Sequence, residues 1–150
     1  MAQCVALGAA ADYVRNALEN ENASEHLQAC SNAFVGALRA AAFRYEITAC
    51  DAQRLPNTIS IRFLKSAGSS NAYVDARALL EQTPRVFASI GAACHNRSVQ
   101  PSATLKAMGC SDEQAAATLR ISFGHTSTVQ QATEAAQELR KTLEKMLIKK

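Results

Sequence analysis

The chain has 150 residues, of which 48% are hydrophobic and 19% charged, and its net charge at pH 7 is +3. This length and composition predict one folded domain and exclude an intrinsically disordered chain. No apolar run approaches the ~20 residues of a membrane span, and the first residues lack the basic segment of a signal peptide, so we expect a cytoplasmic protein without membrane contact. The small net charge and the absence of tryptophan argue against nucleic-acid binding.

The five cysteines form an odd set without a Cys-X-X-Cys pair, which argues against a disulfide framework and against a structural metal site. Cys4 and Cys30 fall on helical patterns among alanines, where free cysteine usually behaves as a small core residue. Cys50 and Cys110 lie near turns. Cys94 differs from these four because a strand-like segment precedes it and a polar loop follows it.

In the first half of the chain, the hydrophobic period changes from helical to strand-like. Apolar residues recur near a 3.6-residue period over residues 2–19 and 24–43, which predicts two helices. Residues 58–64 have a period of two, with apolar side chains at alternate positions from Ile59 to Phe63. This alternation predicts a half-buried strand.

The next elements are short. Asn71 is expected to open a helix over residues 71–82, and residues 86–90 are expected to form a second strand. A short helix should start at residues 101–102 and stop at Gly109, because glycine commonly ends helices. The loop between the second strand and this helix contains Cys94.

Capping patterns and periodicity define the C-terminal elements. Ser111 and Gln114 match the capping box of another short helix, and residues 119–123 alternate as a third strand. Ser127 and Gln130 match the capping box of a long C-terminal helix. Its expected buried stripe consists of Val129, Ala132, Ala136, Leu139, Leu143 and Met146.

Three strands with helices between them predict an α+β fold of the α/β-sandwich type. We expect a small three-stranded sheet with helices packed mainly on one face and a long C-terminal helix. The chain contains no internal repeat and no linker rich in proline or glycine. Residues 1–150 are therefore expected to form one domain.

Cys94 is the candidate nucleophile. It follows Gly91-Ala-Ala and precedes His95-Asn-Arg97, and nearby positive charge favours the thiolate form that attacks. His95 could serve as a proton donor or acceptor for this thiol. Side chains of adjacent residues usually point apart, however, so a surface histidine is the simpler interpretation.

Arg120 is the candidate binding residue. It lies within the strand pattern of residues 119–123, on the face opposite the apolar side chains. Two interpretations remain open for it. It is either a solvated residue on an edge strand or a carboxylate clamp, since guanidinium groups bind carboxylates through two parallel hydrogen bonds.

Five segments carry a family resemblance by their order and spacing: Ser89-Ile-Gly-Ala-Ala-Cys94-His, Pro101-Ser102, Leu105-Lys-Ala-Met-Gly109, Leu119-Arg-Ile-Ser-Phe-Gly124 and Thr126-Ser-Thr128. Together they resemble the C-terminal segment of the cysteine desulfurases, class-V aminotransferase-like enzymes of fold type I that use pyridoxal phosphate. Leu55-Pro-Asn-Thr58 and the run from Gly91 to His95 resemble the selenocysteine lyases of that family.

The resemblance implies that residues 1–150 are a C-terminal small domain and that the large pyridoxal-phosphate-binding domain is absent. Nothing in the chain resembles the family's Arg-Pro-Gly-Thr motif, the Ser-X-His-Lys sequence of the cofactor lysine or the aspartate of the pyridinium nitrogen. None of the six lysines follows a histidine. The cofactor of the complete enzyme therefore has no implied binding residue here, and this chain alone is expected to be inactive.

The resemblance also implies roles for two residues. Cys94 matches the catalytic cysteine, whose thiolate takes sulfur from the substrate and leaves alanine. Arg120 matches the arginine that binds the substrate's α-carboxylate. The implied substrate is cysteine or selenocysteine, and the implied partners are the large domain, a sulfur or selenium acceptor protein and a second subunit of the complete enzyme.

Two other interpretations remain. In the first, the chain is a stand-alone interaction or persulfide-carrier module, in which Cys94 accepts a persulfide from a partner without any cofactor. In the second, it is a folded remnant with an ordinary Cys94. His125 and Val129-Gln-Gln131 depart from the residues common in the family at these positions, which leaves the activity of this copy open.

Overall fold

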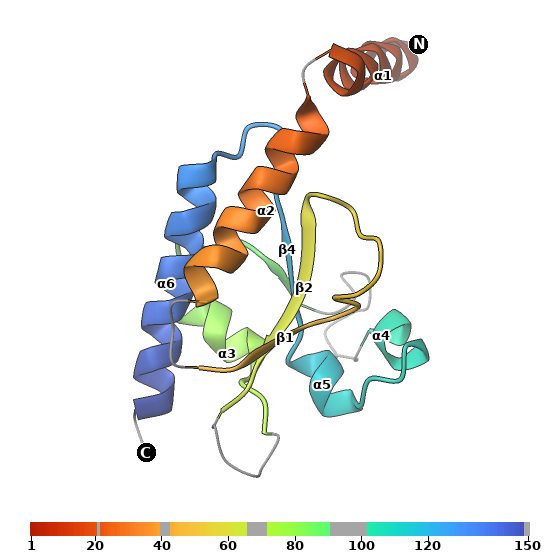
Figure 1. Ribbon diagram of the computed structural model, residues 1–150. Helices are drawn as coiled ribbons and strands as arrows, with labels where there is room; N and C mark the ends of the chain where they lie inside the picture. The colour runs from red at the N-terminus through yellow and green to blue at the C-terminus, as the bar shows by residue number, and fades with distance from the viewer. Residues whose placement is uncertain (21, 40–42, 66–71, 91–101, 149–150) are drawn as a thin grey trace.

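The computed structural model describes residues 1–20, 22–39, 43–65, 72–90 and 102–148. Helices and strands are interspersed along these ranges (Figure 1). In chain order the elements are α1 (Ala2–Asn20), α2 (Ala23–Arg39), β1 (Tyr45–Ile47), β2 (Thr58–Phe63), α3 (Ala76–Glu81), β3 (Ser89–Ile90), α4 (Ala103–Ala107), α5 (Asp112–Ala116), β4 (Leu119–Ser122) and α6 (Val129–Ile148).

The sheet has the strand order β1-β2-β4-β3, and every neighbouring pair is antiparallel. The predicted α+β class is confirmed, but the sheet has four strands where three were expected. The sequence analysis missed β1, a three-residue edge strand in which Tyr45 pairs with Phe63 and Ile47 with Ile61. Three residues are too few to show an alternating pattern.

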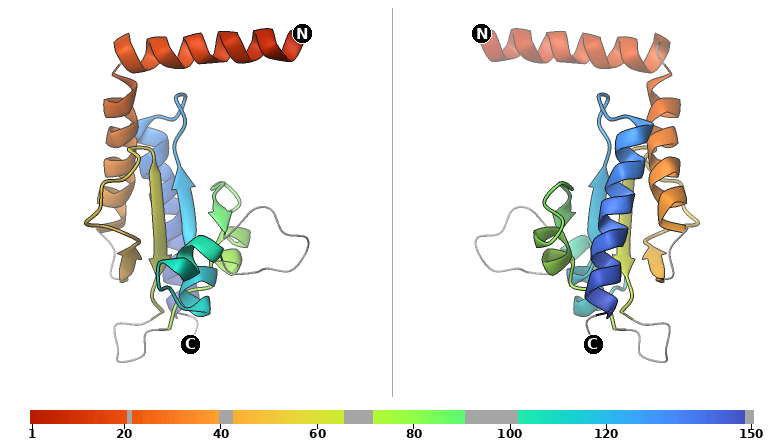
Figure 2. Two further views of the ribbon diagram at one scale, coloured as in Figure 1. Left: turned by 90° about the vertical axis from the view of Figure 1, so that its right-hand side faces the viewer. Right: turned by 90° about the vertical axis from the view of Figure 1, so that its left-hand side faces the viewer.

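Helices α2 and α6 lie side by side over one face of the sheet, and α3 contributes to the same core (Figures 1 and 2). The helices therefore pack mainly on one face, as predicted. The hydrophobic effect stabilises this layer, since large apolar side chains from both sides are removed from water. Its fully buried large side chains are Phe34, Leu38, Ile61, Phe63, Leu79, Leu119, Leu139 and Leu143.

The other face of the sheet is polar and largely open. It carries Thr58, Ser60 and Arg62 from β2, and Arg120 and Ser122 from β4. Side chains alternate between the two faces of a strand, so the buried residues at the intervening positions direct these groups away from the core. Helices α4 and α5 lie on this side of the sheet (Figure 1).

Helix α6 begins one residue later than its sequence pattern suggested. Thr128 Oγ1 accepts a hydrogen bond from the Gln131 amide, and Gln131 Oε1 accepts one from the Thr128 amide, so these two residues form the capping box. Ser127 Oγ instead accepts a hydrogen bond from the Gly124 amide. Val129, which was expected in the buried stripe, is 44% exposed. The first buried residue of the helix is Ala132.

Two other elements are shorter than expected. Helix α3 begins after Asp75, whose carboxylate accepts a hydrogen bond from the Ala78 amide; Asn71, the expected first residue, lies outside the described residues. Strand β3 comprises Ser89 and Ile90 alone, because these are the residues that pair with β4. Phe87, inside the predicted strand, is 94% exposed.

The capping box of Ser111 and Gln114 is confirmed at the start of α5. Gly109 ends α4, as predicted. Its φ of 84° lies in the left-handed region that favours glycine. There the Cys110 amide donates a hydrogen bond to the Leu105 carbonyl, and the chain turns toward α5.

Helix α1 extends from the end of α2, clear of the sheet (Figure 2). Ala17 is its one residue classed as buried among those described, and the ring of Tyr13 lies edge-on to His125 with a centroid distance of 5.5 Å. The expectation of a core position was right for Cys30, whose thiol pKa is raised by burial, and wrong for Cys4, which is exposed. No helix in the described ranges is long and apolar enough to cross a membrane.

Candidate functional site

Arg120 lies on β4, an interior strand with β2 on one side and β3 on the other. It is directly opposite Ser60 of β2 and Ser89 of β3. Both flanking residues are small and polar, so neither covers the guanidinium. The expectation of an edge-strand position for Arg120 is therefore wrong, while its predicted place on the face opposite the apolar side chains is confirmed.

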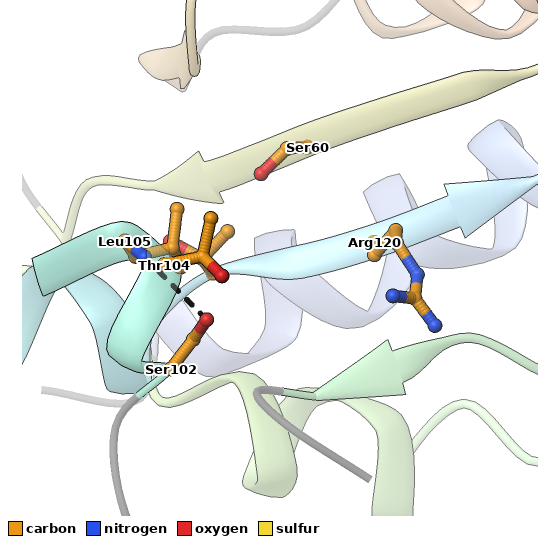
Figure 3. Close-up of a pocket in the computed structure, with 6 residues that line it drawn as sticks. Ser60, Ser102, Thr104, Leu105 and Arg120 are labelled. Atoms are coloured by element: carbon orange, nitrogen blue, oxygen red, sulfur yellow. Dashed lines mark hydrogen bonds between the residues drawn. The ribbon is translucent and has the colours of Figure 1, made fainter. Parts of the chain in front are cut away.

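The guanidinium of Arg120 turns toward β3 and away from Ser60 (Figure 3). Its Nη2 donates a hydrogen bond to Ser89 Oγ at 3.3 Å. The Ser60 hydroxyl donates instead to Thr48 Oγ1, also at 3.3 Å. Within the described part of the chain, no carboxylate lies within ion-pair distance of Arg120.

Arg120 opens onto a pocket of about 200 Å³ between the sheet and helix α4. The lining is polar apart from one leucine. Its hydroxyl groups can donate or accept hydrogen bonds with a small polar ligand, and the guanidinium supplies a fixed positive charge. The lining residues are Ser60, Ser102, Thr104, Leu105, Thr118 and Arg120.

Arg62, on the same face of the sheet, has a different environment. Its Nε donates to Glu46 Oε2 at 2.7 Å, its Nη1 donates to Cys110 Sγ at 3.6 Å, and its guanidinium carbon lies 5.7 Å from the centre of the Tyr73 ring. Burial lowers the pKa of Arg62, but the hydrogen bonds and charges of Glu46 and Cys110 raise it overall. The carboxylate of Glu46 thus balances the charge of Arg62, whereas Arg120 has no anionic partner among the described residues.

A more apolar recess of about 310 Å³ adjoins the Arg120 pocket and shares Ser60, Thr104 and Leu105 with it. Leu55 and Thr58 line this recess. They are the ends of the Leu55-Pro-Asn-Thr58 segment that resembles the selenocysteine lyases. The fold thus brings that segment to the same side of the sheet as Arg120.

The other predicted site residue, Cys94, lies outside the described residues, as do His95 and Pro101. The structure does describe the chain on both sides of this segment. Ser89, just before it, bonds to Arg120, and Ser102, just after it, lines the Arg120 pocket.

A family model for aminotransferase class V matches residues 1–134. The chain belongs to the class-V aminotransferase family. Its resemblance to the cysteine desulfurases within this family is also confirmed, because curated relatives with that name and a solved structure of the same fold match it.

Two curated relatives illustrate the match. Cysteine desulfurase IscS of Vibrio vulnificus (strain CMCP6) is 33% identical over 94 residues, which are 63% of this chain and 21% of the relative. Cysteine desulfurase IscS of Ectopseudomonas mendocina (strain ymp) is 26% identical over 144 residues, or 96% of this chain and 33% of the relative. The chain thus spans about a third of the length of such a relative.

The X-ray structure of the NifS-like protein from Rickettsia africae ESF-5 superposes with a TM-score of 0.65 at 22% identity, over 87% of this chain and 31% of that one. At this identity the comparison shows the shared fold. The mixed architecture and its long C-terminal helix are therefore those of the NifS-like proteins over the matched part.

Class-V aminotransferases use pyridoxal phosphate. A site for this cofactor needs a lysine for a Schiff base and an acidic group for the pyridinium nitrogen. The lining of the Arg120 pocket contains neither, and two of the described lysines, Lys106 and Lys141, form ion pairs with acidic residues. The described residues that line the Arg120 pocket therefore do not make a pyridoxal phosphate site.

The sequence analysis did not identify the residues around Arg120, above all Ser60 and Ser89. Ser60 was placed on the polar face of its strand, but a single strand pattern does not show which residue of another strand lies opposite. The register of three strands is needed to bring Ser60, Arg120 and Ser89 together. No signal in the sequence itself indicates that register.

The structural role of Arg62 can be tested with Glu46→Gln. This substitution removes the charge partner of an arginine whose side chain is 12% exposed, so we expect the free energy of unfolding to fall by about 1 kcal/mol, discounted for the partial exposure of Glu46. Asp12→Asn breaks a largely exposed pair with Arg15 and should cost below about 0.5 kcal/mol. Urea unfolding measures both, and equal losses would contradict the structural role.

Proposed function

We propose that this chain is the small domain of a pyridoxal-phosphate-dependent cysteine desulfurase or selenocysteine lyase. In the complete enzyme, Arg120 binds the α-carboxylate of cysteine or selenocysteine, and Cys94 is the nucleophile that takes the sulfur atom or acts on selenium as alanine is released. The cofactor, which supplies the chemistry that weakens the bond to sulfur or selenium, is held by a large domain outside this chain.

The observation that carries this proposal is the guanidinium of Arg120, which has no carboxylate partner among the described residues and lies beside a pocket lined by serine and threonine hydroxyls. The backbone of Arg120 is paired on both sides within the sheet, and its guanidinium donates a hydrogen bond to Ser89 of β3. The guanidinium is also permanently charged and planar, so it can bind a carboxylate through two hydrogen bonds and fix the orientation of an amino acid. Arg62 cannot serve in this way because Glu46 already occupies its guanidinium.

Chain connectivity supports the assignment of Cys94. Cys94 follows Ile90, the last residue of β3, by four residues, and a fully extended chain of that length spans about 14 Å at most. Ile90 is next to Ser89, the hydrogen-bond partner of Arg120. The pocket is therefore within reach of a nucleophile at position 94.

Helix α1 supports the proposal of a missing domain. Leu7, Val14 and Leu18 recur at seven- and four-residue spacing and are 73%, 53% and 64% exposed. Such a stripe is typical of a helix that packs against a partner. Since the chain spans about a third of the length of its relatives, we propose that the large domain covers this stripe.

Substitutions in the complete enzyme test the roles of the two residues. Arg120→Ala should raise KM for L-cysteine about 10- to 150-fold, because charge-assisted hydrogen bonds contribute about 1.5–3 kcal/mol. Arg77→Ala, which removes an exposed arginine of α3, is the matched control and should leave KM unchanged. Cys94→Ser should abolish sulfide release without altering the unfolding transition.

Two results of that experiment would overturn the proposal. An unchanged KM in the Arg120 variant would show that this arginine is only a solvated strand residue. Sulfide release by the Cys94 variant would remove the assigned nucleophile. A persulfide on Cys94 formed only by transfer from another desulfurase would instead support a carrier module that uses no cofactor.

Hydrogen exchange tests the packing of α1. In this chain we expect the α1 amides to exchange rapidly, because an exposed helix opens at little free-energy cost. In the complete enzyme the same amides should be protected at least about 100-fold, as expected for opening that costs roughly 3 kcal/mol more. Equal protection in the two proteins would show that the large domain does not cover this helix.

A further inference from the structure

We propose that Ser89 is a positioning residue for substrate binding: its hydroxyl holds the guanidinium of Arg120 in the orientation that receives the substrate's carboxylate. This inference rests on the proposed function of Arg120 and extends it to a residue that does not itself touch substrate. We therefore expect removal of the Ser89 hydroxyl to weaken the affinity for substrate, although Ser89 acts only by orienting Arg120.

The contact that carries the inference joins two neighbouring strands. Ser89 and Arg120 are opposite each other in the β3–β4 register, and Arg120 Nη2 donates to Ser89 Oγ at 3.3 Å. Among the described residues this is the hydrogen bond that the Arg120 side chain makes. The serine therefore restrains an otherwise exposed arginine.

The geometry separates Ser89 from the serine on the other side of Arg120. Ser60 is opposite Arg120 in the β2–β4 register, but its hydroxyl donates to Thr48 Oγ1 on the far side of β2. The guanidinium extends toward β3 and not toward β2 (Figure 3). The Arg120 side chain thus points toward Ser89, with which it is hydrogen-bonded, and away from Ser60, which is hydrogen-bonded to Thr48.

The bond to Ser89 leaves the carboxylate-binding capacity of Arg120 intact. A guanidinium has five N–H groups, and Nη2 carries two of them. One donates to Ser89, so the second remains available with a neighbouring nitrogen for a two-point contact with a carboxylate. Ser89 can therefore hold the arginine while the substrate is bound.

Orientation matters here because the long side chain of arginine loses conformational entropy when it is immobilised. A guanidinium already restrained by Ser89 loses less when the substrate binds, which favours binding. Removing the hydroxyl should weaken the affinity for a carboxylate about three- to tenfold, the range expected for one hydrogen bond of a partly exposed group.

Steady-state kinetics of the complete enzyme distinguish a positioning role of Ser89 from a nonspecific loss of activity. Ser89→Ala should raise KM for L-cysteine about three- to tenfold and leave kcat within about twofold, because it removes binding that the ground state and transition state share. Ser89→Thr keeps the hydroxyl and should restore KM. Ser122→Ala, two residues along β4 from Arg120 on the same open face, is the matched control and should change neither constant.

The outcomes distinguish this inference from the proposed function. If Arg120→Ala raises KM and Ser89→Ala does not, Arg120 binds the carboxylate without help and the inference fails alone. If neither variant changes KM, the function proposed for Arg120 fails as well. A fall in kcat with an unchanged KM in Ser89→Ala, or no rescue by Ser89→Thr, would also overturn the positioning role.

A measurement on this chain needs no activity. NMR relaxation of the Arg120 Nε–Hε group reports how tightly the guanidinium is held. We expect increased fast motion in Ser89→Ala and no increase in Ser89→Thr or Ser122→Ala. Equal mobility of Arg120 in the parent chain and in Ser89→Ala would show that the serine does not restrain it.

Discussion

Strand β4 has one face sealed by helices and one face open, and the position of Arg120 depends on this difference. Leu119 and Ile121 point into the core beneath α2 and α6, so the alternation of the strand directs Arg120 to the other face. A shift of the register by one residue would expose the leucine and bury the arginine, at a large cost in free energy. Burial of Leu119 and Ile121 thereby fixes the face of the sheet on which Arg120 lies.

The two arginines on the open face show how similar residues acquire different roles. Arg62 is enclosed by Glu46, Cys110 and Tyr73, and its charge is compensated within the fold. Arg120 has serine neighbours and keeps its charge available. In the proposed function this division lets one arginine join β2 to β1 and to the turn between α4 and α5, while the other recognises substrate.

The Arg120 pocket offers a guanidinium and several hydroxyl groups, but its lining includes neither a lysine nor an acidic residue. The exposed stripe of α1 and the open face of the sheet are both surfaces that a larger protein would be expected to cover. This agrees with a chain that spans about a third of the length of its relatives. In the proposed enzyme, the small domain supplies the carboxylate clamp and the nucleophile, and the large domain supplies the cofactor.

Local sequence patterns predicted the long helices and β2, because burial of one face leaves a period that the sequence records. They failed where the tertiary fold decides between equivalent local patterns. Ser127–Gln130 and Thr128–Gln131 both match a capping box, and the hydrogen bond from Gly124 to Ser127 leaves Thr128 as the cap. The family resemblance singled out Arg120 as a candidate, whereas Ser89 became a candidate only when the strand order placed it opposite Arg120.

In the proposed enzyme this chain supplies one part of a divided active site, and the cofactor binds to the other part. A visible-absorption titration of the purified chain with pyridoxal phosphate tests this division. We expect no saturable absorption band, because the lysine and acidic partner that the cofactor needs are absent from the Arg120 pocket. A saturable band would show that a lysine of this chain binds the cofactor, and the active site would then not be divided in this way.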